Sequence, residues 1–404
     1  MGNINIIFLT MTDIQDIESR YIYTELLKVF IGNGHRVTIV SPTTSKDKPK
    51  YELLRYSNYQ MVKIRILSGT NKNLIKKAIN IIALEDWYIR AVKKFLNDEK
   101  FDLVLYSTPP ITLGKAIKYI KTRDNAKTYL MLKDIFPQNA VDLGMMSRIG
   151  YKSIIYNYFR NKEKKLYKFS DYIGCMSEAN VNYLLSHNPE LSPDNVGLCV
   201  NSVIPMDENL VNKDMLRSKY GIPLNTTVFF YGGNFGKPQG IDFLTKVLEN
   251  NLNKNDRYFV LCGDGTDYHI IESLIRNNPK SNIMLIKGLP KEEYDNLLQA
   301  CDIGMLFLDY RFTIPNFPSR ILPYMEYSMP IFACTDSNTD IGIKIEEGNF
   351  GWWCPSNNLE ICTNLIDKIC TDSSISQKGK NARDYLEKHY IAEISYDQIM
   401  NNIE

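Results

Sequence analysis

Residues 312–332 combine amino-acid types that could hold a phosphate group. The sequence FTIPNFPSRILPYMEYSMPIF places a proline-punctuated polar loop before a short predicted helix and an apolar strand. Ser319 is predicted to cap this helix, whose first-turn N–H groups would attract an anion, and the guanidinium of Arg320 would add to that attraction. Glu326, one turn beyond Pro323, could accept hydrogen bonds from the paired hydroxyls of a ribose. An ordinary loop and helix with a solvated Glu326 explains the stretch equally well.

Three glycine-containing loops in the same half of the chain follow predicted strands. GGNFGKPQG at 232–240 follows an apolar strand and precedes a helix, while GDG at 263–265 and KGL at 287–289 follow the next two strands. Glycine permits close approach of the backbone to a phosphate, and loops after parallel strands meet at one edge of a sheet. Together these loops could take a base, a ribose and a diphosphate. The candidate residues are Gly233, Asn234, Lys237, Gly263, Lys287, Gly288, Leu289, Ser319, Arg320 and Glu326.

The same loops disfavour other ligand classes. The chain has no G-x-G-x-x-G followed by a suitably spaced acidic residue and no G-x-x-x-x-G-K-[ST] stretch, so we expect neither NAD nor a P-loop nucleotide. The eight cysteines include no C-x-x-C pair and the four histidines are scattered, which favours buried reduced thiols over disulfides or a zinc site. We therefore expect no metal and no cofactor.

Alternating strand and helix signals predict an α/β fold. Apolar runs at 4–9, 35–40, 62–66, 103–106 and 128–132 occupy the first half with helical segments between most of them, and the pattern restarts at 227–231. This predicts two doubly wound, Rossmann-like domains that face each other across a cleft. We expect an N-terminal domain at 1–205, a C-terminal domain at 206–385 and a helical tail at 386–404 that returns to the first domain. Dehydrogenases, kinases and sugar-binding proteins share this organisation.

Three loops of the first half follow predicted strands and contain candidate functional residues. They span 13–18, 107–110 and 133–139, and ligands of doubly wound sheets lie beyond the carboxyl ends of the strands. The candidates are Asp13, Asp16, Pro109, Lys133 and Asp134. Asp13 and Asp16 could equally belong to a solvated loop, and Asp134 could equally cap a helix.

The net charge of +2 conceals an asymmetry between the halves. Residues 1–200 contain 29 Lys and Arg against 19 Asp and Glu, a balance of +10, and the remainder carries −8. Much of the positive charge lies in 72–94, which has helical apolar spacing, and in 148–168, which mixes seven basic residues with five aromatic ones. Basic amphipathic helices suit an anionic membrane surface. A solvated helix face is an equal alternative, and nucleic acid is disfavoured because no recognition motif accompanies the charge.

The start of the chain contains no pattern typical of a secretory signal. MGNINIIFLTMTDIQD lacks a basic lead and its apolar run is short. We therefore expect a cytoplasmic protein, which would be attached peripherally to the inner face of the cell membrane if its basic stretches bind lipid.

Several motifs together resemble those of retaining GT-B glycosyltransferases of family 4. They are GGNFGKPQG, GDG, the FPSRILPYME helix, NTDIG at 338–342 and FGWW at 350–353, with STPP at 107–110 and LKDIFPQNAVDLG at 132–144. The likeness covers essentially the whole chain and is nearest to the bacterial O-antigen and capsule branch proposed to transfer N-acetyl-L-fucosamine. It implies a UDP-sugar donor bound by the C-terminal domain and a polyprenyl-diphosphate-linked sugar as acceptor on the N-terminal domain.

The resemblance implies roles for the candidate residues. The donor contacts would come from the ten residues given above, and Arg320, Lys133 and Asp134 would act in catalysis without a metal. Asp13, Asp16 and Pro109 would contact the acceptor.

The chain also departs from the pattern of the family. Pro315 and Pro323 replace the two glutamates of an E-x7-E motif, so Glu326 is our candidate substitute for the ribose contact. Asn234 and Gln239 replace two basic residues common in that loop. Two other hypotheses follow from these departures: a catalytically silent scaffold that binds a nucleotide sugar, and a sugar-nucleotide epimerase on the same fold.

Overall fold

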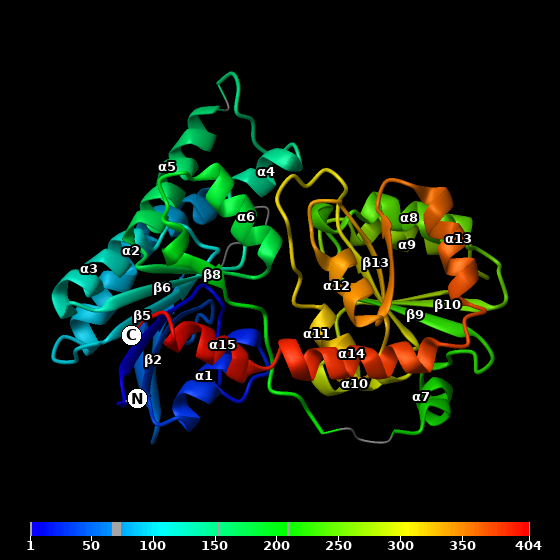
Figure 1. Ribbon diagram of the computed structural model, residues 1–404, viewed down its shortest axis with the longest axis horizontal. Coiled ribbons are helices and arrows are strands. Elements are labelled where there is room, and N and C mark those ends of the chain that lie inside the picture. Colours follow the sequence, from blue (N-terminus) through cyan, green and yellow to red (C-terminus); the bar gives the residue numbers. More distant parts are fainter. Residues whose placement is uncertain (1, 67–73, 152, 208–210, 404) are drawn as a thin grey trace. The chain divides into compact units, whose positions relative to one another are not determined.

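The computed structural model describes residues 2–66, 74–151, 153–207 and 211–403 (Figure 1). The chain divides into two compact units, one formed by Met1–Ile204 with Ala392–Glu404 and the other by Pro205–Ile391. The C-terminal segment therefore belongs to the first unit from residue 392, whereas we had expected the return to begin at 386. The difference arises because the long helix Ile375–His389 (α14) packs on the second unit.

The first unit is built on an eight-stranded sheet with the order β3-β4-β2-β1-β5-β6-β7-β8. Adjacent strands are parallel except for the β3–β4 pair, which is antiparallel. The strands are β1 (Asn5–Leu9), β2 (Arg36–Thr43), β3 (Tyr51–Arg55), β4 (Tyr59–Arg65), β5 (Leu103–Ser107), β6 (Lys127–Leu132), β7 (Tyr172–Cys175) and β8 (Val196–Leu198). We had not predicted β3, β7 or β8, whose sequences are short or lack an apolar run.

Helices cover both faces of this sheet. They are α1 (Ile22–Gly32), α2 (Leu74–Phe95), α3 (Gly114–Asp124), α4 (Gln138–Asp142), α5 (Ser153–Phe169), α6 (Glu178–His187) and α15 (Ala392–Met400), with the 3-10 turn η1 (Pro193–Asn195). One core cluster joins α1 and α15 to the central strands through Leu27, Phe30, Ile399 and Met400. On α15, the Tyr396 hydroxyl lies 2.9 Å from Nε2 of His35, which fastens the end of the chain to the first unit.

The second unit is built on a six-stranded, fully parallel sheet with the order β11-β10-β9-β12-β13-β14. The strands are β9 (Thr227–Asn234), β10 (Arg257–Asp264), β11 (Ile283–Ile286), β12 (Ile303–Phe307), β13 (Ile331–Thr335) and β14 (Gly351–Pro355). β9, β12 and β13 are almost continuously apolar and buried, as expected for parallel strands covered on both faces. The last three residues of the FGWW motif begin β14.

The helices of the second unit form two layers. Figure 1 shows α8 (Ile241–Asn250), α9 (Tyr268–Asn277) and α13 (Leu359–Ile369) over one face of the sheet, where they share a core cluster with the strands. α10 (Lys291–Gln299), α11 (Ile321–Glu326) and α14 lie over the other face. The remaining elements are α7 (Lys213–Tyr220), α12 (Ile341–Gly348) and the 3-10 turn η2 (Lys237–Gln239).

The predicted helix start at Ser319 is wrong by one residue. The N-cap of α11 is Arg320, and no side chain caps the helix. Ser319 contributes its carbonyl oxygen instead, which accepts a hydrogen bond from the Leu322 N–H at 3.1 Å. The loop before α11 contains Pro315 and Pro318 and approaches as a turn, so the hydroxyl of Ser319 does not point back at the first N–H groups of the helix. α11 has only six residues, which weakens any contribution from its dipole.

None of the helices in the described part of the chain is both long enough and apolar enough to cross a membrane.

Candidate functional site

The glycine loops of the second unit bring main chain very close to main chain. Gly233 at the end of β9 has a φ of +120°, and Gly263 at the end of β10 has a φ of +154°. A Cβ atom on Gly263 would lie 1.8 Å from the carbonyl oxygen of Gly233, so no other residue fits there. These two loops lie side by side because β9 and β10 pair in parallel through Gly263 with Gly233 and end at Asp264 with Asn234.

Arg320 lies against this glycine edge. A Cβ atom on Gly233 would meet the guanidinium carbon of Arg320 at 3.5 Å, and the same carbon lies 5.2 Å from the ring centroid of Tyr231. The Nη1 atom of Arg320 is buried and has no hydrogen-bond partner, and the same holds for Nδ2 of Asn316 in the preceding loop. Buried donors without partners are costly. Both atoms are therefore available to an anionic or oxygen-rich ligand.

Three tyrosines that we had not singled out support Arg320 and the glycines. The Tyr324 hydroxyl accepts a hydrogen bond from the Gly232 N–H at 3.3 Å and donates to the Met305 carbonyl at 3.2 Å. The Tyr294 hydroxyl fills the place where a Cβ on Gly232 would lie. Burial raises the pKa of Tyr231, and the positive charge of Arg320 opposes that shift. Sequence alone gave no signal for this cluster, because its members are separated by tens of residues.

The NTDIG motif holds the loop that carries Asn316. The Asn338 side chain donates to the Phe312 carbonyl at 2.6 Å, and the Thr339 hydroxyl donates to the Asn316 carbonyl at 2.5 Å. The Asp336 carboxylate in turn accepts from the N–H groups of residues 338 and 339. These bonds tie the loop before α11 to the end of β13 and so fix where Arg320 can lie.

The tips of the glycine loops carry exposed polar groups. Asn234 donates to the Gln239 side chain at 2.9 Å. Lys287 lies 3.6 Å from the Asp264 carboxylate, whereas Lys237 has no ion-pair partner among the described residues. Gly288 has a φ of +48°, which lets the chain turn sharply before Leu289. Within the described residues, Arg320 and Lys237 are therefore two cations at this edge of the sheet that have no carboxylate beside them.

The structure does not bring Glu326 to these loops. Glu326 ends α11, about 9 Å along the helix from Arg320 at 1.5 Å per residue. It lines a cavity with Asp302 and Pro330, which precede β12 and β13, so it lies at the opposite end of the sheet. Its carboxylate accepts from the Met206 N–H at 3.3 Å, and Arg383 donates to the carbonyls of both residues. Our prediction that Glu326 replaces the ribose-binding glutamate is therefore wrong.

In the first unit, Asp134 follows β6 and is largely enclosed. Both of its carboxylate oxygens accept from Nδ2 of Asn139 at 2.8 Å. Burial raises the pKa of Asp134 to about 6, and the bond from Asn139 opposes the rise. The N-cap of α4 is Pro137, so Asp134 does not cap that helix. A carboxylate whose pKa lies near neutrality is a common property of functional sites.

Lys133, the neighbour of Asp134, is held by main-chain oxygens. Its ammonium donates to the carbonyls of Cys199 and Val200 at 3.0 and 3.1 Å. Burial lowers the pKa of this lysine. The two bonds direct the side chain towards the end of β8.

The other candidates of the first unit lie at or near the surface. Asp13 forms an ion pair with the buried ammonium of Lys63 at 2.7 Å, which gives this carboxylate a structural partner. Asp16 is exposed, and its carboxylate accepts from the Glu18 N–H at 3.1 Å. Pro109 is exposed after β5, where the Thr108–Pro109 and Pro109–Pro110 peptide bonds are both cis. Of the basic stretches, residues 72–73 and 152 lie outside the described residues.

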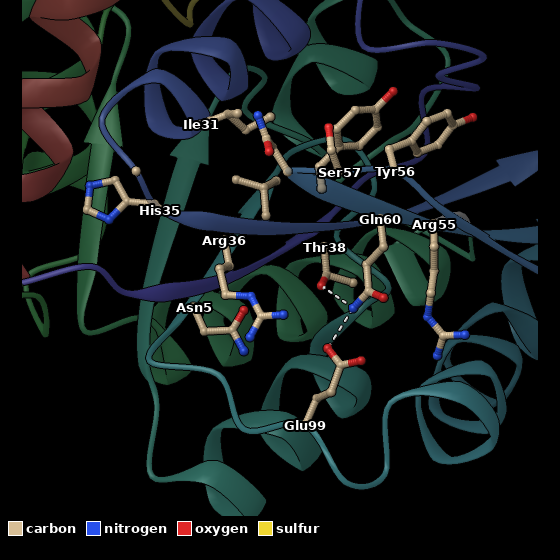
Figure 2. Close-up of a pocket in the computed structure, with 14 residues that line it drawn as sticks. Asn5, Ile31, His35, Arg36, Thr38, Arg55, Tyr56, Ser57, Gln60 and Glu99 are labelled. Carbon is tan, nitrogen blue, oxygen red and sulfur yellow. Dashed lines mark hydrogen bonds between the residues drawn. The ribbon is translucent and has the colours of Figure 1, made fainter.

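A separate cavity of about 440 Å³ opens at the other end of the first sheet (Figure 2). Its polar side chains come from the start of β2, the β3–β4 turn and the segment after α2. Gln60 crosses it and donates to both Thr38, at 3.0 Å, and Glu99, at 2.6 Å. Because this cavity lies at the amino ends of the strands, it is not part of the edge where a doubly wound sheet binds its ligand.

Three cysteine sulfurs gather in the core of the second unit. Sγ of Cys334 lies 3.4 Å from that of Cys354 and 3.6 Å from that of Cys362, and these thiols could in principle share a metal ion. All three side chains are fully buried in an apolar cluster. A metal–thiolate group there would leave buried charge without a counter-ion. We interpret the cluster as core packing by small apolar thiols.

Two helix-covered sheets whose strands are mostly parallel, with glycine-containing loops at the carboxyl ends of the second, are the arrangement of the GT-B fold. The comparisons with solved structures agree. Sucrose-phosphate synthase from Thermosynechococcus elongatus superposes with a TM-score of 0.76 at 15% identity and 98% coverage of both chains. HepE from Anabaena in complex with UDP and glucose gives 0.68 at 13% identity, with 99% of both chains covered. WaaG gives 0.67 at 15% identity over 98% of this chain and 99% of that one. The predicted fold class is confirmed.

The family comparison concerns the second unit. Residues 212–388, which span most of this unit, are similar to the family model described as "Glycosyl transferases group 1". A curated relative, the probable glycosyltransferase WbjE of Pseudomonas aeruginosa, is 26% identical over 318 residues, which are 77% of this chain and 76% of that protein.

Proposed function

We propose that this chain is a retaining glycosyltransferase of family 4. It moves a sugar from a UDP-sugar to a polyprenyl-diphosphate-linked saccharide during O-antigen or capsule polysaccharide synthesis. The observation that carries the proposal is the guanidinium of Arg320, which lies against Gly233 with a buried, unpartnered N–H donor. A diphosphate is the part of the donor that would satisfy it.

The donor would lie along the glycine edge of the second unit. Gly233 and Gly263 let main chain approach the phosphates, and Lys237 adds an unpaired positive charge. Lys287, Gly288 and Leu289 would face the base and ribose. The resemblance of these loops to the family, together with a relative fold solved with bound UDP-glucose, supports UDP as the nucleotide.

The chemistry asks the protein to stabilise charge on the leaving group. The bond between the anomeric carbon and the diphosphate oxygen breaks, a bond to an acceptor hydroxyl oxygen forms on the same face, and the hydroxyl proton leaves with the diphosphate. Negative charge grows on the phosphates as the sugar gains oxocarbenium character, and Arg320 and Lys237 offset it. We propose that these cations take the place of a metal ion.

Asp134 is the residue of the first unit that we propose to contact sugar or acceptor hydroxyls. Its carboxylate is oriented by Asn139, and burial raises its pKa to about 6. The two carbonyl contacts of Lys133 support a positioning role for that lysine, and we retain Asp16 and Pro109 as acceptor contacts. Asp13, paired with Lys63, would act mainly by shaping the loop.

The sugar we propose is N-acetyl-L-fucosamine or a related N-acetyl amino sugar, on the strength of the motif resemblance. The proposed site of action is the inner face of the cell membrane, where a chain whose first 200 residues carry +10 would be attached peripherally. WaaG, which is similar in fold, is described as involved in lipopolysaccharide biosynthesis.

The test is a panel of nucleotide sugars, each offered with and without a polyprenyl-diphosphate monosaccharide. We expect one UDP-sugar to release UDP only when acceptor is present, together with a lengthened lipid-linked product. Release from a donor of another nucleotide would remove UDP from the proposal, and conversion of the donor without acceptor would indicate an epimerase.

A second candidate function is a catalytically silent subunit that binds a nucleotide sugar. The observation in its favour is the loss of both family glutamates to Pro315 and Pro323, without a replacement by Glu326. Tight binding of a UDP-sugar by the purified chain, with no turnover across a broad set of acceptors, would favour this alternative.

A further inference from the structure

The segment before α5 and the start of that helix expose an unusual amount of apolar surface. Six of the fourteen large hydrophobic side chains that are exposed in the described part of the chain fall between residues 145 and 158. Ile149 is 83% exposed and Ile154 is 72% exposed. The others are Met145, Tyr151, Ile155 and Tyr158. Such a concentration of exposed apolar groups usually marks a surface that contacts a membrane or another protein.

The two sides of α5 differ in character. Glu163, Leu166 and Tyr167 are buried and attach the helix to the first unit. The opposite side is a stripe at spacings of three and four residues, formed by Ile154, Tyr158, Asn161, Lys165 and Lys168. This stripe is apolar over the first half of the helix and basic over the second, so apolar and charged groups are separated along the axis.

The basic residues of α5 differ in whether a carboxylate pairs with them. Arg160 pairs with Glu163, Lys162 with Glu85 at 3.1 Å, and Lys164 with Glu190 at 3.3 Å. Lys165 and Lys168, on the exposed stripe, are without an ion pair among the described residues. The basic groups left without carboxylates are therefore those that follow the exposed apolar groups on the same side.

We propose that residues 145–151 and 153–158, together with the exposed stripe of α5, dock this chain on an anionic lipid bilayer. The apolar end would enter the headgroup region, while Lys165 and Lys168, about 16 and 21 Å along the helix from Ile154, would contact lipid phosphates. The helix would therefore meet the surface end-on and inclined rather than lying flat. Figure 1 shows the segment that follows α4 projecting beyond the helices of the first unit. The inference deepens the proposed function, because it names the surface that brings the chain to a lipid-linked acceptor.

Co-sedimentation with vesicles tests this inference without donor or acceptor. The full chain should bind vesicles of phosphatidylglycerol with phosphatidylethanolamine, and bind phosphatidylcholine vesicles much more weakly. The double variant Ile149→Glu/Ile154→Glu should weaken partitioning by about tenfold or more, and Lys165→Gln/Lys168→Gln by a similar factor that shrinks as salt is raised. The matched control is Ile343→Glu/Ile361→Glu, which changes two exposed isoleucines of the second unit and should leave partitioning unchanged.

Three results would overturn the docking surface. They are no vesicle binding by the wild type, equal loss in the control variant, and a wild-type dimer in light scattering that the Ile149→Glu/Ile154→Glu variant abolishes, since the surface would then bind a second copy. The proposed reaction is judged separately by UDP release with a detergent-solubilised acceptor. That readout should survive the isoleucine substitutions if only docking is lost, and it can fail while vesicle binding persists.

Discussion

The proposed donor chemistry depends most strongly on one side chain, Arg320. Removing it would leave the growing charge of a diphosphate leaving group with Lys237, which has no ion pair within the described part of the chain, as a counter-charge at this edge. Loss of one such contact typically lowers turnover by about a hundredfold or more. Because Nη1 of Arg320 has no protein partner, we expect Arg320→Ala to reduce kcat/KM by that factor while Tm changes by a few degrees at most.

The comparison for this variant is Arg276→Ala, which removes an exposed arginine of the same unit that pairs with Glu272. We expect it to leave both turnover and Tm near wild type. Loss of turnover by Arg320→Ala only in step with loss of folded protein would remove Arg320 from the site.

Asp134 gives the stability of the folded chain a pH dependence of defined sign. Its pKa is about 6 in the folded chain, above the ordinary 3.8. The protonated form is therefore favoured by folding, and stability is lost as pH rises from about 3.8 through 6. We expect Asp134→Asn to lose less stability over that interval than the wild type, in thermal unfolding followed at several pH values.

The same carboxylate is proposed to act in its ionised form. Wild-type kcat/KM should then rise with pH through about 6, and Asp134→Asn should have a low rate without this rise. A wild-type rate that is flat between about pH 5 and 7 would show that Asp134 is not required as a carboxylate.

At the scale of elements, α15 is fastened to the first unit through a histidine. Nδ1 of His35 accepts from the Ile4 N–H at 3.2 Å, so the neutral ring carries its proton on Nε2, facing the Tyr396 hydroxyl. Burial lowers the pKa of His35 from 6.5. The unfolded chain thus takes up a proton before the folded one does, and stability falls as pH drops below about 6.5.

We expect urea unfolding to show this loss between about pH 7.5 and 5.5 in the wild type and a smaller loss in His35→Gln. Tyr396→Phe keeps the ring that packs edge-on against Phe30 and removes only the hydroxyl. It should therefore lower stability at both pH values by a similar amount. An unchanged pH dependence in His35→Gln would refute this role of the histidine.

The end of α11 holds the segment that enters the second unit. Glu326 accepts from the Met206 N–H, and Arg383 bonds to the carbonyls of both residues. Glu326→Gln keeps one acceptor and should cost about 1 kcal/mol in unfolding free energy. The Kd for UDP should stay within about twofold, since α11 places Glu326 roughly 9 Å from Arg320. A large rise in that Kd, measured by calorimetry, would restore Glu326 as a ribose contact.

At the scale of the whole molecule, the proposed reaction uses protein cations where other enzymes use a divalent ion. We expect incubation with EDTA, followed by removal of the chelator, to leave acceptor-dependent UDP release unchanged within about twofold. Restoration of lost activity by added magnesium or manganese would contradict the proposed role of Arg320 and Lys237. The control is a parallel sample passed through the same exchange without chelator.

The fold class could be predicted from sequence because it depends on local regularities. Apolar runs such as those of β9 and β12 alternate with helical segments along the chain. This alternation is typical of parallel strands that helices bury on both faces. The glycine loops could also be predicted from sequence. Their backbone geometry requires glycine itself, because a Cβ atom on Gly263 would overlap the carbonyl oxygen of Gly233. The short strands β7 and β8 were not found, because pairing with neighbours rather than their own sequence makes them strands.

The sequence by itself determined two helix-covered parallel sheets, the four loops after the strands of the second sheet, and the excess of positive charge in the first half. Only the tertiary structure decided which side chains those loops bring together. Glu326 is only six positions after Arg320 in the sequence, yet helix α11 places it at the other end of the sheet. Tyr231, Tyr294 and Tyr324 belong to separate elements, yet they lie together. The direction in which a side chain points depends on rise and rotation along its element and on the neighbours that sheet order supplies, and neither is recorded in residue spacing alone.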